Sequence, residues 1–159
     1  MKSVLKYAIF FSLFAILGFS REFLFVNINN QLYKLYYHNN DILIPESLRF
    51  LSNFDYETIY YLKYPLTILY FILYFLVSFY SAKNICDNKK ITQWIVYIYA
   101  LLLILASITM AYNYIIKVQL SGDEYTFSRW LMGIAQSPLV AFFTIATSKL
   151  YSKFNTEKK

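Results

Sequence analysis

The sequence contains very little cysteine or histidine. Cys86 is its one cysteine and His38 its one histidine, in a chain of 159 residues. A single cysteine excludes an internal disulfide, a CxxC redox pair and a cysteine-based zinc site. A single histidine excludes a multi-histidine metal site within one chain. We therefore predict no metal and no cofactor.

Charged residues, glycine and proline are also scarce. Charged residues make up 15% of the chain, against about 25% in soluble domains, and there are three glycines and three prolines. A soluble surface needs more charge than this, whereas a lipid-facing surface excludes charge. The chain instead has 58% hydrophobic residues and 17 tyrosines. Tyrosine has an apolar ring and a polar tip, which suit the boundary between membrane and water.

The net charge of +6 does not indicate a nucleic-acid partner. Lysines and arginines are scattered between apolar blocks, whereas a nucleic-acid-binding protein gathers them in a patch or stripe. The predicted partner is the lipid bilayer, and no nucleic acid is expected.

Four apolar blocks predict the fold class. They cover residues of about 7–28, 60–82, 91–116 and 130–151. Each has roughly 20 residues or more, enough to cross a ~30 Å hydrocarbon core as a helix, and each is apolar on all sides. We predict an all-α, polytopic membrane helical bundle with about four transmembrane helices, forming a single integral membrane domain over residues 1–159. Pro65 and Pro138 are expected to kink the second and fourth helices.

The first apolar block has two interpretations. Residues 7–19 follow Lys2 and Lys6, and Gly18-Phe19-Ser20 supplies small residues at the spacing of a signal-peptide cleavage site. However, residues 23–26 resume the apolar run directly after Arg21-Glu22. We expect a retained helix, and a cleaved signal peptide stays the alternative.

The distribution of basic residues predicts the orientation. Lysines concentrate at both ends of the chain and in the short connection near residues 83–90, whereas most acidic residues lie in the other connections. Basic residues in short loops mark the cytoplasmic side. We predict a multi-pass protein of the cell inner (plasma) membrane with both termini in the cytoplasm.

An outer loop of about residues 29–59 is the one substantial segment predicted outside the membrane. Apolar residues near its start recur at helical spacing, namely Phe25, Ile28, Leu32, Leu35 and Tyr36. The polar face of the same helix would contain Asn27, Asn30, Gln31 and Lys34. The first helix should therefore continue out of the membrane or bend to lie on its surface.

A short helix is predicted after Ile44-Pro45-Glu46, because proline suits the first helical position. Its apolar residues Leu48, Leu51 and Phe54 lie three residues apart. Ser52 and Asp55 fit a capping box that leads into the second spanning helix.

Polar residues within the predicted spans are candidates for a functional site. At about 1.5 Å per residue, they concentrate in the outer half of the bundle. The candidates are Arg21, Glu22, Asn113, Arg129 and Gln136. They would line a polar cavity open to the outside, or they would hold helices together and reach the headgroups.

All three arginines fall on the predicted outer side. They are Arg21, Arg49 and Arg129. Because a guanidinium binds carboxylate or phosphate with two hydrogen bonds, these residues are candidate contacts with another membrane protein or an anionic lipid. Pairing with nearby acidic residues is the alternative.

No residue pattern indicates catalysis. His38 with Asp41 and Ser52 has the residue types of a hydrolase triad, but no glycine-rich elbow accompanies them. Asp55 and Glu57 could be the paired carboxylates of an intramembrane aspartyl enzyme, but they precede the second helix instead of lying within it. We interpret Cys86 as an inert interfacial thiol. We predict that the protein is not an enzyme.

Three short elements resemble a known group of proteins. They are Arg21-Glu22-Phe23-Leu24-Phe25 after the first helix, Arg129 at the start of the last one, and Gln136-Ser137-Pro138-Leu139 within it. In these elements the chain resembles uncharacterised small four-helix membrane proteins of flavobacteria and relatives, including exosortase-associated membrane proteins. The resemblance implies the bacterial inner membrane and assigns no chemistry.

We hypothesise a non-catalytic accessory or assembly subunit of a bacterial envelope complex. The alternative is a small transporter or lipid-binding protein with an outward-facing polar cavity.

Overall fold

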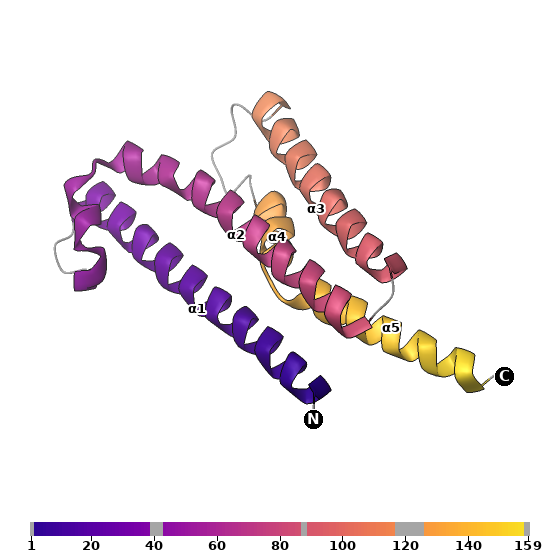
Figure 1. The fold of residues 1–159 in the computed structure, drawn as a ribbon. Helices are drawn as coiled ribbons and strands as arrows, with labels where there is room; N and C mark the ends of the chain where they lie inside the picture. The colour runs from indigo at the N-terminus through magenta and orange to yellow at the C-terminus, as the bar shows by residue number, and fades with distance from the viewer. Residues whose placement is uncertain (1, 39–42, 87–88, 117–125, 158–159) are drawn as a thin grey trace. The chain divides into compact units, whose positions relative to one another are not determined.

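The computed structural model describes residues 2–38, 43–86, 89–116 and 126–157 and shows an all-α protein, as predicted. In chain order the elements are α1 (Lys2–Tyr37), the 3-10 helix η1 (Glu46–Asn53), α2 (Tyr56–Cys86), α3 (Lys89–Ile116), α4 (Thr126–Ala135) and α5 (Leu139–Glu157) (Figure 1).

Among the described residues, three helices are long and apolar enough to cross a membrane, namely α1, α2 and α3. The bent pair formed by α4 and α5 makes a fourth candidate if it counts as one span. The predicted multi-pass helical architecture is therefore confirmed at the level of three or four candidate spans. With 36 residues, α1 is about 54 Å long and exceeds a ~30 Å hydrocarbon core. Of the two predicted courses for the first helix, the structure shows the uninterrupted one.

The fourth apolar block forms two helices instead of one kinked helix. The axes of α4 and α5 differ by 57° across the break. Pro138 lacks an N–H to continue the hydrogen-bond ladder of α4, and its ring would clash with the preceding turn. Its carbonyl instead accepts the hydrogen bond from the Phe142 N–H at 3.0 Å, which begins α5. Pro65, in contrast, lies inside the continuous helix α2.

The chain divides into two compact units, residues 15–70 and residues 1–14 with 71–159. The first is called the 15–70 unit below and the other the second unit.

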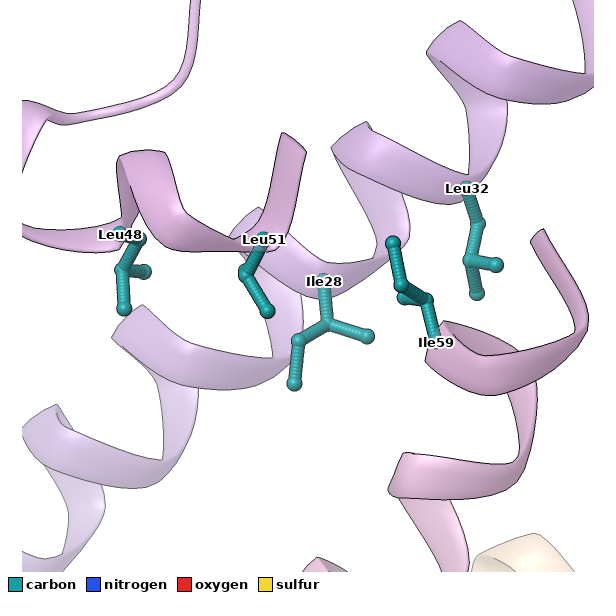
Figure 2. Close-up of a cluster of buried hydrophobic side chains, with 5 residues drawn as sticks. All are labelled: Ile28, Leu32, Leu48, Leu51 and Ile59. Carbon is teal, nitrogen blue, oxygen red and sulfur yellow. The ribbon is translucent and has the colours of Figure 1, made fainter. Parts of the chain in front are cut away.

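A small apolar cluster forms the centre of the 15–70 unit. Figure 2 shows its buried side chains, which come from three elements: Ile28 and Leu32 of α1, Leu48 and Leu51 of η1, and Ile59 of α2. A 3-10 helix has three residues per turn, so the three-residue spacing of Leu48 and Leu51 places both on one face. This cluster attaches η1 to the two long helices.

The prediction of which residues form the polar face of α1 was wrong. Asn27 and Gln31 were expected opposite Ile28 and Leu32, but all four are buried. The reason is that η1 and α2 pack against this side of α1. The Asn27 amide donates to the Phe23 carbonyl at 2.7 Å, which satisfies one polar group inside the contact. The Gln31 side-chain oxygen, in a residue only 2% exposed, has no hydrogen-bond partner among the described residues.

The predicted short helix after Pro45 is confirmed, but the predicted capping box is wrong. The Leu48 N–H donates to the Pro45 carbonyl at 2.9 Å and begins η1. The Ser52 hydroxyl donates to the Arg49 carbonyl at 2.6 Å, inside η1. Asp55 directly precedes α2, and its carbonyl accepts from the Ile59 N–H at 3.2 Å. Asp55 therefore occupies the N-cap position, which its residue type favours.

In the second unit, small buried residues of α2 pack against side chains of α3. Ser78, Ser81 and Ala82 are all buried, and the Ser78 and Tyr99 hydroxyls form a buried hydrogen bond of 2.9 Å. Small residues and hydroxyl hydrogen bonds are the usual means of helix contact in lipid. Ala135 of α4 and Val140 of α5 complete this core.

Leu51→Ala tests the attachment of η1. Leu51 is 1% exposed, so its truncation should destabilise the attachment of η1 by about 2–4 kcal/mol. Backbone amides of residues 46–53 should then exchange with deuterium much faster, as measured by mass spectrometry. Leu43→Ala is the matched control, because Leu43 is 88% exposed, and its effect should stay within about 0.5 kcal/mol. Equal exchange rates in the two variants would contradict the assigned role of Leu51.

Candidate functional site

Arg21 belongs to a contact between α1 and α2 in the 15–70 unit. Its guanidinium lies 5.4 Å from the centre of the Phe25 ring, and Phe25 packs edge-on against Tyr70 with ring centres 6.1 Å apart. The Tyr70 hydroxyl donates to the Ser20 hydroxyl oxygen at 3.1 Å. The Ser20 hydroxyl in turn donates to the Leu17 carbonyl at 3.1 Å. In this arrangement Arg21 is half-buried against Phe25 of its own helix, and Glu22 is exposed.

The other candidate residues lie in different parts of the fold. Arg49 is exposed on η1, in the 15–70 unit. Arg129 is exposed on α4, and Gln136 is buried in the turn between α4 and α5. Asn113 belongs to α3, and its side chain lies outside the described residues. These last three residues belong to the second unit, so the predicted cavity stays a prediction.

Gln136 has a clear role in the local backbone. Its N–H donates to the Met132 carbonyl at 2.9 Å, which completes the last turn of α4. The following Ser137 donates through its hydroxyl to the Ile134 carbonyl at 2.7 Å. Gln136 and Ser137 thus donate to backbone carbonyls of α4 that would otherwise lack a hydrogen-bond donor because of the break at Pro138.

His38 ends α1. It is exposed and has a φ of 53°, in the left-handed region that commonly terminates helices. Of its hypothetical triad partners, Asp41 lies outside the described residues and Ser52 bonds to Arg49. Within the described ranges, no cluster of three or more His, Cys, Asp or Glu residues could hold a metal ion.

Tyrosines of α1 and α2 line a groove, here named the tyrosine groove, that was not predicted from the sequence. It has a volume of about 300 Å³ and lies in the 15–70 unit. On the α1 side it is lined by Asn29, Leu32, Tyr33, Tyr36 and Tyr37. On the α2 side it is lined by Tyr56, Tyr60 and Lys63.

Ring contacts join the two sides of the tyrosine groove. Tyr36 of α1 meets Tyr56 of α2 with ring centres 6.0 Å apart, and Tyr56 stacks on Tyr60 at 6.3 Å. The Lys63 ammonium lies 6.0 Å from the centre of the Tyr60 ring, within reach of a cation–π interaction. The groove therefore combines aromatic walls with one cationic group.

Helical spacing explains why these tyrosines gather. Tyr33, Tyr36 and Tyr37 lie at i, i+3 and i+4, so they share one face of the last turns of α1. Tyr56 and Tyr60 lie four residues apart on α2 and share a face in the same way. This spacing was visible in the sequence, but the pairing of the two faces was not.

Comparison of the chain with protein-family models, with curated proteins and with solved structures finds no match.

A double-mutant cycle tests the contact beside Arg21. Ser20→Ala and Tyr70→Phe each remove one hydroxyl of the 3.1 Å hydrogen bond. Their coupling energy should be about 0.5–2 kcal/mol, the range for hydrogen bonds between helices in lipid. Reversible unfolding of the purified protein in mixed detergent micelles gives the four stabilities. The pair Thr109→Ala with Tyr70→Phe serves as the control, because the Thr109 hydroxyl donates to carbonyls of its own helix. A coupling as small as that of the control would show that the Ser20–Tyr70 bond contributes nothing.

Proposed function

We propose that this chain is a non-catalytic, multi-pass protein of the bacterial inner membrane that serves as an accessory or assembly subunit of an envelope complex. The exposed side of η1 supports this proposal most directly. Arg49 and Phe50 are exposed there, while Leu48 and Leu51 on the opposite side are buried.

The composition of this surface suits contact with another protein. Arginine and aromatic residues are enriched in the centres of protein interfaces, and Arg49, Phe50 and Phe54 supply both types in one short segment. The buried side of η1 holds the segment in place, so less conformational freedom would be lost on binding. The resemblance of three short elements to small membrane proteins of flavobacteria and relatives supports the choice of compartment.

The use of polar side chains elsewhere fits a structural role. The Thr67 hydroxyl donates to the Lys63 carbonyl and the Thr144 hydroxyl to the Val140 carbonyl, each within its own helix. The Ser78 and Tyr99 hydroxyls bond to each other across a helix contact. The hydrogen-bonding capacity of these hydroxyls is thus used within the fold. The exposed side of η1 is then the surface that we expect a partner to recognise.

Removal of the exposed side chains of η1 should abolish partner binding. We expect a stoichiometric partner to co-purify with the tagged protein from its native host in mild detergent. The double variant Arg49→Ala with Phe50→Ala should lose that partner, because interface residues of these types each account for about 1–4 kcal/mol of binding free energy. Quantitative mass spectrometry of the purified complexes measures the ratio of partner to bait.

The control is Phe143→Ala with Lys149→Ala, which removes an exposed aromatic and an exposed cation from α5. It should retain the partner. Arg129→Ala, the other exposed arginine, tests whether α4 contributes. Purification without any stoichiometric partner, or equal recovery in all variants, would contradict the proposal.

The proposed orientation places η1 outside and Cys86 inside the cell. In spheroplasts, a membrane-impermeant maleimide should label a Ser47→Cys variant made in a Cys86→Ser background. The native Cys86 should stay unlabelled until the membrane is permeabilised. Labelling in detergent controls for intrinsic reactivity, because Ser47 is exposed and Cys86 is half-buried. The reverse pattern of labelling would place both termini outside.

A further inference from the structure

The tyrosine groove lies at the ends of two helices that are long and apolar enough to cross a membrane. The candidate span of α1 extends to Tyr37, and that of α2 begins at Tyr56. The apolar blocks place the hydrocarbon boundary near Ile28 and Tyr60. At about 1.5 Å per residue, the groove then extends from about 5 Å inside this boundary, at Lys63, to about 13 Å outside it, at Tyr37. The headgroup layer is about 5–8 Å thick on each side of the bilayer, so the groove spans the depth of lipid phosphates and extends about 5 Å or more beyond this layer at Tyr37.

The charge of the tyrosine groove favours an anionic occupant. Among the described residues that line it, Lys63 is the one with a full charge at neutral pH, and no carboxylate is present. Aromatic walls alone also attract cations, but the Lys63 ammonium repels them. An ammonium offers three hydrogen-bond donors, and tyrosine hydroxyls and the Asn29 amide offer more. These donors match the oxygens of a phosphodiester.

The rest of the lining suits the carbon atoms of a lipid. Leu32 and the ring faces of Tyr33 and Tyr56 are apolar and would contact glycerol and the first acyl carbons. The volume of about 300 Å³ is at the lower end of ligand sites and can hold one headgroup.

From depth, charge and lining together, we infer that the tyrosine groove binds the headgroup of an anionic phospholipid, with its phosphodiester on the Lys63 ammonium. The acyl chains extend from the groove into the surrounding bilayer. The inference goes beyond the proposed accessory role, because it requires lipid alone and no protein partner.

Native mass spectrometry of the purified full-length protein tests this inference. The protein in detergent is mixed with equal amounts of phosphatidylglycerol and phosphatidylethanolamine that have the same acyl chains. The wild type should retain phosphatidylglycerol about fivefold better, as expected for one lysine at a membrane surface. Lys63→Gln should bring the ratio close to one, and Lys63→Arg should keep most of the preference.

Lys34→Gln is the matched control for loss of charge. Lys34 lies on the end of α1 that contributes tyrosines to the groove, but it does not itself line the groove. This variant should therefore keep the preference for phosphatidylglycerol. Circular dichroism verifies that each variant keeps its helical content. Soluble glycerol phosphate, at the concentration of the lipid, should not displace it.

Three results would overturn the inference. They are a wild type without headgroup preference, equal losses in Lys63→Gln and Lys34→Gln, and displacement by soluble glycerol phosphate, which would assign the groove to a free phosphate. Because the measurement uses the isolated protein, a missing protein partner affects the accessory role and leaves this test unchanged.

Discussion

Backbone hydrogen bonding is the constraint on which the rest of this structure depends. In the hydrocarbon of a membrane no water can pair with an N–H or C=O group, so each must find its partner within the chain. The long helices α1, α2 and α3 meet this requirement through their own ladders. Where Pro138 interrupts the ladder, the Ser137 hydroxyl and the Phe142 N–H form local hydrogen bonds to the backbone. The low content of glycine and proline keeps such interruptions rare.

The structure of the 15–70 unit also depends on the attachment of η1 to its two long helices. Leu48 and Leu51 enter one apolar cluster with Ile28 and Ile59 (Figure 2). Because η1 has only eight residues, its own hydrogen bonds would not keep it folded, and the buried leucines hold it in place. With Leu48 and Leu51 buried in this cluster, Arg49 and Phe50 are exposed on the other side of η1. The apolar cluster extends to Leu32, which also lines the tyrosine groove.

Polar side chains in the long helices act mainly between or within helices. Tyr70 bonds to Ser20 and Tyr99 to Ser78, each across a helix contact. Such bonds contribute little individually, on average about 0.6 kcal/mol in lipid, but they select one helix register. The unpaired oxygen of Gln31 is the exception among the described residues.

The sequence by itself determined the class of the protein: helical, apolar and multi-pass, with a short helix after Pro45. These properties depend on composition and local spacing, which hydropathy and residue propensities report directly. Arg21 lies on the long helix α1, but Gln136, which was expected within one spanning helix, lies in the turn between α4 and α5.

Only the tertiary structure decided which helix faces meet. It buried Asn27 and Gln31 beside Ile28, broke the fourth block into α4 and α5, and joined tyrosines of α1 and α2 into one groove. The physical reason is that lipid is as apolar as a helix surface, so no hydrophobic contrast separates helix-facing from lipid-facing residues. The contacts that settle the choice join residues about 20 or more positions apart, such as Tyr36 and Tyr56 or Ser20 and Tyr70. Local spacing reports the face of each helix but not its partner.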